Sequence, residues 1–282
     1  MIYLLLAIAS SAMVSICMRV SEKYIKNEMG MFMANYAVCI LLSSLFMNHQ
    51  NTGLATYVAP VVIVLGIISG VLYLVSFVFL KMNMKHNGIV MASTFMKLGV
   101  LIPTVMAVVV FREMPEWTQV IGIVLSLLAI FIIHFEKEAL HESSKKSWLI
   151  LLLVLNGFTD SMANIFEQVG DADAKDGYLL ITFITAFLLA MVFTFVNKEK
   201  VSRNDLLFGV LIGIPNYFSA RFLLLALGSV DAVLVYPMYS VATIVIITLV
   251  GIMVFREKIS KKKACAMGLI MVALCLLNIS PN

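Results

Sequence analysis

The feature that most constrains this chain is a series of long apolar runs that recurs from one end of the sequence to the other. Each run approaches the length of about 20 residues that an α-helix needs to cross the hydrocarbon core of a bilayer. The runs are continuous, whereas the strands of a membrane barrel alternate apolar and polar residues in segments of about ten. We therefore predict an all-α integral membrane protein with ten spanning helices, over residues 2–18, 31–47, 57–80, 88–111, 117–135, 148–169, 178–196, 206–227, 232–255 and 264–278.

Composition excludes several other classes of protein. The 282 residues are 62% hydrophobic and 13% charged, whereas soluble domains are about 45–50% apolar and about 25% charged. So hydrophobic a chain is not intrinsically disordered. Four cysteines are too few for a secreted disulfide scaffold, and a net charge of +4 in short, separate clusters argues against a nucleic-acid partner. The expected surroundings are the lipid bilayer.

A polar stretch divides the chain into two halves of similar length. Residues 136–147 form the longest polar segment between spans, which predicts a linker between residues 1–135 and 148–282. The first apolar run carries Ala7-Ile8-Ala9, which is similar to a signal-peptide cleavage site, but no Lys or Arg precedes it. Because signal peptides begin with a positively charged region, we expect this run to remain as the first helix.

The distribution of basic residues predicts the orientation in the membrane. Sixteen of the twenty Lys and Arg fall in the loops after the first, third, fifth, seventh and ninth spans, and only Arg112 and Lys175 fall in the other loops. Short loops rich in Lys and Arg stay on the cytoplasmic side. We therefore expect a multi-pass protein of the inner or plasma membrane with both termini outside.

The two halves resemble each other in sequence. Val110-Phe111-Arg112-Glu113 reappears 144 residues later as Val254-Phe255-Arg256-Glu257. The same offset pairs Tyr73 with Tyr217, Leu80 with Leu224 and Thr104 with Thr248, and an offset of 143 pairs Gly66 and Gly70 with Gly209 and Gly213. Five spans in each half would invert the second half relative to the first, which is an architecture typical of secondary transporters.

Two of these repeated motifs have simple structural interpretations. Small residues four apart let membrane helices approach closely, so we expect helix packing at Gly66, Gly70, Gly209 and Gly213. Arg112 and Glu113 lie at the end of a predicted span, where we expect helix capping or interfacial anchoring and no contact with substrate.

The first half contains a longer pattern that resembles a known family. Met96-Lys97-Leu98-Gly99-Val100-Leu101-Ile102-Pro103, then Phe111-Arg112-Glu113 and Gln119-Val120-Ile121-Gly122, is similar to the EamA-type members of the drug/metabolite transporter superfamily. The second half matches less completely, and Ile247 stands where Pro103 does in the first. The resemblance implies a fold of two five-helix repeats and the movement of small metabolites, with export favoured. Members carry amino acids, nucleotide sugars, drugs or lipid-linked sugars, so the resemblance names no substrate.

Charged residues inside predicted spans are the first candidates for a binding site. A charge at the centre of a spanning helix costs about 2.5–3.5 kcal/mol on insertion scales, so such residues face the protein interior or a wet cavity. Lys97 and Asp160 lie near the middle of the fourth and sixth spans, and Arg221 lies off centre in the eighth. Asn156, Asp160 and Asn164 recur every four residues and so share one helix face. Hydrogen bonding between helices is the alternative explanation of this polar face.

Further polar residues accompany these charges. They are Ser93, four residues before Lys97; Tyr217, four residues before Arg221, with Asn216 beside it; Tyr236 and Tyr239 in the ninth span; and Tyr73, the counterpart of Tyr217. Lys97 and Arg221 suit a carboxylate or phosphate, and Asp160 suits an amine, so together they favour an amino-acid-like zwitterion. A structural salt bridge between Lys97 and Asp160, or titration of either group to couple transport to protons or another ion, are the alternatives.

Motifs of other function classes do not occur in the sequence. It has no phosphate-binding loop, no His-Glu-x-x-His and no Gly-x-Ser-x-Gly, and its four His residues show no metal-ligand spacing. We therefore expect no enzyme activity, cofactor or metal. The sequence predicts a secondary transporter of a small polar or zwitterionic metabolite, for which a monomer would suffice. A lipid-linked sugar flippase or a multidrug exporter is the alternative, and a membrane-embedded enzyme is the alternative from another class.

Overall fold

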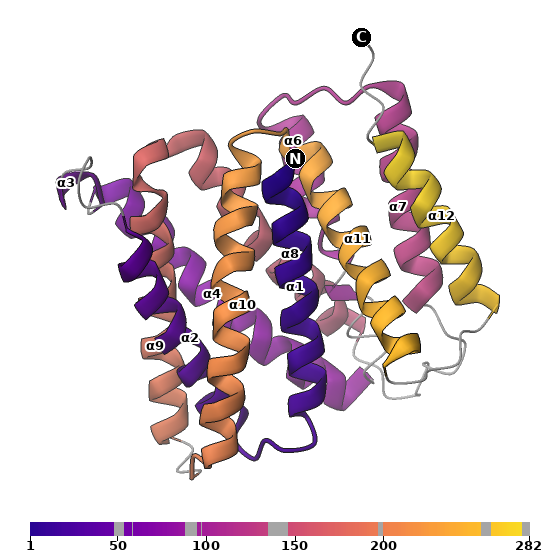
Figure 1. Cartoon of the computed structure of the whole chain (residues 1–282). Coiled ribbons are helices and arrows are strands. Elements are labelled where there is room, and N and C mark those ends of the chain that lie inside the picture. The colour runs from indigo at the N-terminus through magenta and orange to yellow at the C-terminus, as the bar shows by residue number, and fades with distance from the viewer. Residues whose placement is uncertain are drawn as a thin grey trace. The chain divides into compact units, whose positions relative to one another are not determined.

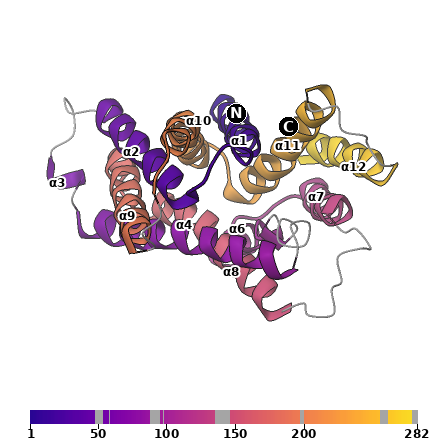
Figure 2. The same ribbon diagram turned by 90° about the horizontal axis from the view of Figure 1, so that it is seen from below.

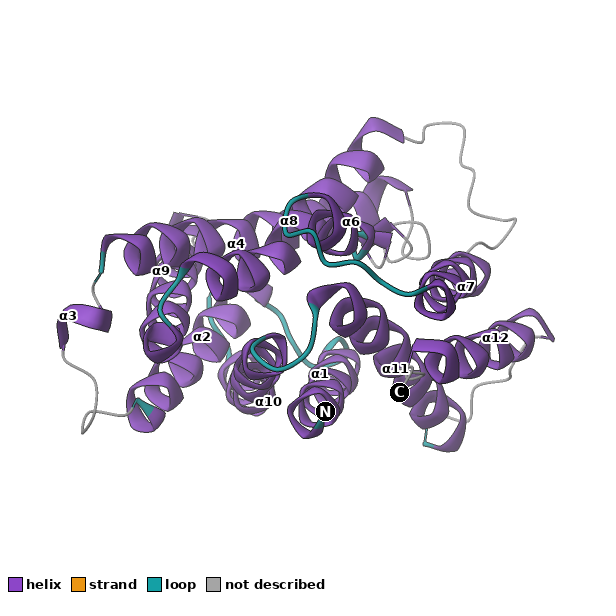
Figure 3. Cartoon of the chain, turned by 90° about the horizontal axis from the view of Figure 1, so that it is seen from above, coloured by secondary structure: helices purple, strands orange, loops and turns teal. Residues whose placement is uncertain are grey.

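The computed structural model describes residues 1–47, 54–57, 59–87, 95–96, 98–134, 146–196, 200–254 and 261–277. Within these ranges the chain forms helices joined by turns and loops, without a strand (Figure 3). The helices, labelled in Figure 1, are α1 (Ile2–Ser21), α2 (Glu28–Phe46), α3 (Leu54–Tyr57), α4 (Pro60–Asn87), α6 (Leu101–Val109), α7 (Trp117–His134), α8 (Lys146–Val169), the 3-10 helix η2 (Ala172–Ala174), α9 (Lys175–Val196), α10 (Arg203–Leu227), α11 (Ala232–Met253) and α12 (Lys261–Leu277).

The all-α membrane fold predicted from the apolar runs is confirmed. In the described part of the chain, α1, α2, α4, α8, α9, α10 and α11 contain segments long and apolar enough to cross a membrane. Helices α7 and α12 contain shorter apolar segments, Trp117–Ile132 and Cys265–Leu277. Only α6, with nine residues, covers part of the predicted span 88–111, of which residues 88–94 and 97 lie outside the described residues. Seven of the ten predicted spans therefore correspond to described helices that are long enough to cross a membrane.

Most predicted boundaries differ from the observed helix ends by a few residues, and two of the differences are informative. Helix α8 begins at Lys146, so the last two residues of the predicted linker 136–147 are helical, and residues 136–145 lie outside the described residues. Helix α10 begins at Arg203, three residues before the predicted span 206–227. The reason for the earlier start is a capping box, in which Ser202 and Asp205 each accept a hydrogen bond from the other's backbone N–H.

The chain divides into two compact units that differ from the two sequence halves. Unit 1 comprises Met1–Leu74 and Ile165–Ser229, and unit 2 comprises Val75–Asn164 and Val230–Asn282. Two of the three boundaries fall inside α4 and α8, and the third lies between α10 and α11. Each unit therefore combines segments from both predicted halves of the sequence.

Glycines set the closest helix contacts of unit 1. Helix α10 packs between α1 and α2, and α2 also packs on α9 (Figure 2). A Cβ added at Gly209 would lie 2.5 Å from the carbonyl oxygen of Met31 on α2, and one at Gly70 would lie 2.5 Å from the carbonyl oxygen of Thr182 on α9. Only glycine allows two backbones to come this close. The predicted packing role of the repeated glycines is confirmed.

Unit 2 is held by packing and by a helix cap. Helix α12 packs on α7, and α11 packs on α6, α7 and α12. Arg112 has a φ of 58°, and the N–H of Glu113 donates to the carbonyl oxygen of Ala107, so the chain turns sharply at the end of α6. The Glu113 carboxylate then accepts a hydrogen bond of 2.8 Å from the N–H of Val233 in the first turn of α11. The capping predicted for this motif is confirmed, whereas its repeat at 255–257 lies outside the described residues.

Candidate functional site

The structure separates the candidate residues into two groups, one in each unit. Tyr73, Asn216, Tyr217 and Arg221 belong to unit 1, and Asn156, Asp160, Asn164, Tyr236 and Tyr239 belong to unit 2. Lys97 and Ser93 lie outside the described residues.

Arg221 is the centre of the group in unit 1. Its Nη1 atom forms an ion pair of 2.7 Å with Oδ1 of Asp176 and donates a hydrogen bond to the hydroxyl of Tyr217, one helical turn away. The guanidinium also lies over the ring of Phe46, 5.4 Å from its centroid. The side chains of Arg221 and Asp176 are 22% and 15% exposed. We call Arg221, Asp176 and Tyr217 the arginine cluster.

Asp176 is a functional candidate that sequence reasoning missed. It lies in the first turn of α9, two residues before the predicted span 178–196, and therefore counted as a loop residue. A carboxylate at a helix N-terminus is favoured by the helix dipole. Its neighbour Lys175 forms a second ion pair, of 2.7 Å, with Glu167 near the end of α8. The alternating signs of Glu167, Lys175 and Asp176 were visible in the sequence, but their pairing depends on the helix packing.

Asn216 makes its side-chain hydrogen bonds to α2. Its Nδ2 atom donates to Oδ1 of Asn35 at 3.2 Å and to Sγ of Cys39 at 3.7 Å. Cys39 is fully buried, and its thiol donates to the carbonyl oxygen of Gly213. Asn216 therefore takes part in the polar contact between α2 and α10, which is the structural alternative for a polar residue in a span.

Asp160 is the centre of the group in unit 2. Its Oδ2 atom accepts a hydrogen bond of 3.1 Å from Nδ2 of Asn156, one turn earlier in α8. Asn156 also donates to the carbonyl oxygen of Met96. Tyr236, which is buried in α11, donates a 2.6 Å hydrogen bond to the backbone carbonyl of Asp160. We call Asn156, Asp160 and Tyr236 the aspartate cluster.

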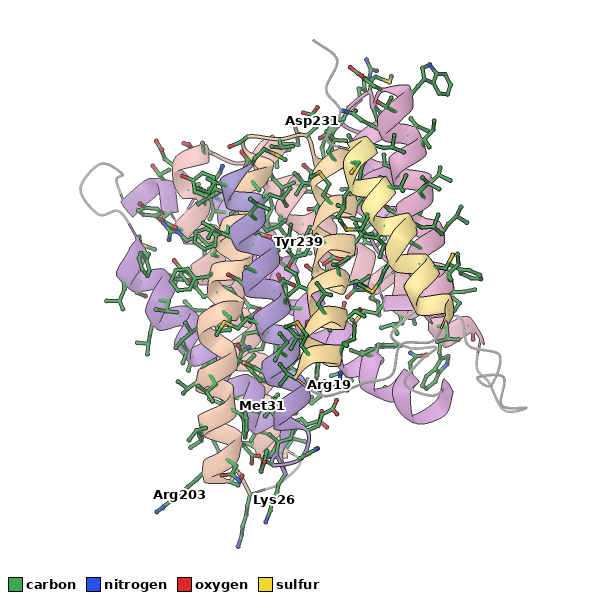
Figure 4. All side chains as sticks on the ribbon, turned by 45° about the vertical axis from the view of Figure 1, so that its right-hand side comes forward. Arg19, Lys26, Met31, Arg203, Asp231 and Tyr239 are labelled. Carbon is green, nitrogen blue, oxygen red and sulfur yellow. The ribbon has the colours of Figure 1, made fainter. Side chains whose placement is uncertain are left out.

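The remaining candidates are Asn164 and Tyr239, which lie close to the aspartate cluster in sequence, and Tyr73 on α4. Asn164 is 1% exposed, and its Nδ2 atom has no hydrogen-bond partner among the described residues. It continues the polar face of Asn156 and Asp160 by one more helical turn. Tyr239, labelled in Figure 4, lies on α11 three residues after Tyr236 and is half-buried, as is Tyr73 on α4.

Side-chain packing on α8 supports the aspartate cluster. The hydroxyls of Ser76 on α4 and Thr159 share a buried hydrogen bond of 2.7 Å. Gly157 lies against the helix-start turn of α6, where an added Cβ would be 2.7 Å from the carbonyl oxygen of Gly99. These contacts fix the middle of α8 and so fix where Asp160 is held. Among the described residues, no group of three His, Cys, Asp or Glu is arranged to hold a metal ion.

Comparisons with known proteins agree with this membrane architecture. Residues 1–135 match the EamA-like transporter family, and residues 177–270 match the family of the Small Multidrug Resistance protein. An uncharacterized protein of Haemophilus influenzae is 25% identical over 271 residues, which cover 92% of this chain and 91% of that protein.

A solved structure, described only as the crystal structure of a protein, has the same fold. It superposes with a TM-score of 0.80 at 15% identity, over 98% of this chain and 95% of its own. The two family matches carry the assignment. The protein is a membrane transporter of the drug/metabolite transporter superfamily, and its first half belongs to the EamA-like transporter family.

Proposed function

We propose that this transporter is a secondary carrier of a small polar or zwitterionic metabolite, amino-acid-like, which it exports across the cell membrane by alternating access. The observation that carries the proposal is the carboxylate of Asp160, which lies within the spanning helix α8 and is hydrogen-bonded to Asn156. Ionisable groups at this depth are expensive to bury, and they mark substrate and ion pathways in membrane proteins.

The aspartate cluster has the chemistry of an ammonium site. Tyr236 donates to the backbone carbonyl of Asp160, and the neutral amide of Asn156 donates to its carboxylate. A carboxylate held inside a spanning helix is the kind of group that pairs with a substrate ammonium, or that takes up a proton in a carrier coupled to protons. For the substrate carboxylate we propose Lys97, which lies outside the described residues.

Arg221 is a weaker candidate for the substrate carboxylate than the sequence suggested. Its guanidinium already pairs with Asp176 and donates to Tyr217. An anionic substrate would have to displace Asp176 and leave that half-buried carboxylate without its charge partner. We therefore propose a structural role for the arginine cluster.

Equivalent glycine contacts support the inverted repeat on which alternating access depends. An added Cβ at Gly66 and at Gly209 would approach the backbone N of Thr182 and of Asn35, at 3.4 and 3.1 Å. At Gly70 and Gly213 it would approach the carbonyl oxygens of the same two residues, at 2.5 and 2.7 Å. Helices α4 and α9 therefore meet in the same way as α10 and α2. Such a repeat allows one half to rock against the other around a central site.

The match of residues 177–270 favours multidrug export as the second candidate function. Export of an amphiphilic cation would also use a carboxylate inside the membrane. The described carboxylates of the matched segment, Asp205 and Asp231, lie at or before the first turns of α10 and α11. Asp160 lies outside that segment, so both candidate functions depend on the same residue and differ in the substrate.

Ligand-dependent thermal stability of the purified protein tests the proposal. Ligand binding raises stability by RT ln(1 + [L]/Kd), about 2.7 kcal/mol at a hundredfold excess over Kd. We expect amino acids to raise the melting temperature of the wild type and of the control Asp173→Asn, whose exposed carboxylate lies in η2, but not of Asp160→Asn. A shift with amphiphilic cations alone would favour multidrug export, and an equal shift in Asp160→Asn would contradict the role of Asp160.

A further inference from the structure

One end of unit 1 carries a group of exposed cations from two loops that are far apart in the sequence. Lys23 and Lys26 lie between α1 and α2, and Lys200 and Arg203 lie at the start of α10. All four side chains are exposed. Figure 4 shows Lys26 and Arg203 projecting from the same end of the helices. We call Lys23, Lys26, Lys200 and Arg203 the basic rim.

The basic rim has no ion pairs in the part of the chain that the structure describes. The nearest buried carboxylate, Asp205, is fully used by backbone donors. Its Oδ1 atom accepts from the N–H of Lys26 at 2.8 Å, and its Oδ2 atom accepts from the N–H of Ser202 at 2.7 Å. Asp205 therefore holds the two loops together through their backbones, and its carboxylate forms no ion pair with the basic rim among the described residues.

Other contacts also fix the two loops against each other. Nδ2 of Asn204 donates to the carbonyl oxygen of Tyr24 at 3.5 Å, and the rings of Tyr24 and Phe208 stack with centroids 5.6 Å apart. A Cβ added at Gly30, at the start of α2, would lie 2.9 Å from a methyl of Val201. These contacts hold the residues of the basic rim in place at the ends of the helices.

An apolar, exposed surface begins directly beside the basic rim. Leu206 and Leu207, in the turn that follows Arg203, are 44% and 57% exposed, and Val210, Leu211 and Ile214 continue the exposed apolar surface along α10. Tyr24, stacked at the edge of the basic rim, is 52% exposed. Tyrosine with Lys and Arg beside apolar residues is the pattern of a membrane interface. A soluble anion could use the cations but would gain nothing from the apolar surface.

We propose that the basic rim binds the phosphate head groups of anionic phospholipids, whose acyl chains lie along the exposed apolar surface of α10. Basic groups of this size next to a spanning helix attract anionic lipid. Arg and Lys donate charge-assisted hydrogen bonds to phosphate oxygens. The predicted orientation places both loops on the cytoplasmic side. The inference does not depend on the transported substrate.

Melting temperatures of the full chain in lipid nanodiscs test the proposal. Discs of phosphatidylcholine are compared with discs that also contain phosphatidylglycerol, for the wild type and for the triple variant Lys23→Gln, Lys26→Gln, Arg203→Gln. The matched control is Lys261→Gln, Lys262→Gln, Lys263→Gln, which removes the same charge elsewhere. We expect phosphatidylglycerol to stabilise the wild type and the control, with the gain abolished by high salt and largely absent in the triple variant.

Single variants give the expected size of the effect. Each cation removed should weaken the apparent affinity for phosphatidylglycerol by about fivefold. Glycerol phosphate added in solution should give no comparable stabilisation, because it lacks the acyl chains. Equal stabilisation of the triple variant and the control by phosphatidylglycerol would contradict the proposal, as would full stabilisation by glycerol phosphate alone.

A second measurement covers the case in which the triple variant does not fold. In Tyr24→Trp, the added tryptophan fluorescence reports on lipids at the edge of the basic rim, with the wild type as background. We expect brominated phosphatidylglycerol to quench it more strongly than brominated phosphatidylcholine at the same mole fraction, and Arg203→Gln to reduce the difference. Equal quenching by the two lipids in Tyr24→Trp would overturn the proposal.

Discussion

The guanidinium of Arg221 and the carboxylate of Asp176 meet at 2.7 Å and join α10 to the first turn of α9. Exposed ion pairs contribute about 0–1 kcal/mol, and breaking a fully buried pair costs about 3–5 kcal/mol. The two side chains are 22% and 15% exposed, so this pair lies between those limits. Breaking the pair should therefore lower the stability of unit 1 by a measurable amount.

Removing either partner of this pair is expected to destabilise the protein. Arg221→Gln or Asp176→Asn should each lower the free energy of unfolding by about 1–3 kcal/mol, and the double variant should lose less than the sum of the two. Thermal unfolding in detergent measures the three values. If the single losses simply add, the two residues are not coupled. If Arg221→Gln abolishes transport while its stability is unchanged, Arg221 binds substrate after all.

The glycine contacts predict which glycines tolerate substitution by alanine. The added methyl group should lower the stability of the protein at glycines that pack against a neighbouring backbone, and not at glycines with open space beside them. Gly70→Ala and Gly213→Ala each place a Cβ within 2.7 Å of a carbonyl oxygen, which belongs to a backbone that cannot move aside like a flexible side chain. Overpacking of this kind typically costs about 1–3 kcal/mol. The control is Gly268→Ala on α12, where the added Cβ meets nothing within 4 Å.

Melting temperatures of the three glycine variants check this prediction. We expect Gly70→Ala and Gly213→Ala to melt at lower temperatures than the wild type, by similar amounts because their contacts are equivalent. Gly268→Ala should be unchanged or slightly more stable, since alanine is the better helix former. A large loss in only one of the two packing glycines would argue against equivalent interfaces.

Much of this architecture could be predicted from the sequence because its signals are local. Apolar runs predicted the spanning helices, glycines four apart predicted the close contacts, and Glu113 predicted a cap at a helix end. The helix that Glu113 caps could not be predicted, because Val233 on α11 is 120 residues away in the sequence. The role of Asp176 could not be predicted either, because Asp176 and Arg221 come together only when α9 and α10 pack against each other. The division of the candidate residues between two units also could not be predicted from their order in the sequence.

Glu113 gives the protein a pH dependence whose sign can be worked out. Burial raises the pKa of its carboxyl, and the nearby charge of Asp231 raises it further, against the opposing effect of the N–H donors of Val233 and Ala232. A folded-state pKa above the unfolded one means that the folded protein binds the proton more tightly. The contribution of Glu113 to stability is therefore complete at acidic pH and is lost as the pH rises through its folded pKa.

Glu113→Gln should remove this pH dependence. Relative to the variant, the wild type should gain stability as the pH is lowered from neutral to about 4. Melting temperatures across this range measure the difference, with the exposed Glu116→Gln as the control. Glu113→Ala, which removes the cap itself, should cost about 0.5–2 kcal/mol at every pH. A wild type that loses stability on acidification relative to Glu113→Gln would reverse the sign and refute the assignment.

The most direct test of a carboxylate site in α8 is uptake of labelled amino acids into proteoliposomes that contain the purified protein. We predict exchange by the wild type and by Asp173→Asn, and a loss of at least about tenfold in Asp160→Asn, the range expected when a charged partner of a substrate is removed. Asn156→Ala, which removes the amide that donates to Asp160, should fall between the two. Undiminished exchange by a folded Asp160→Asn protein would contradict a substrate site at the carboxylate of Asp160.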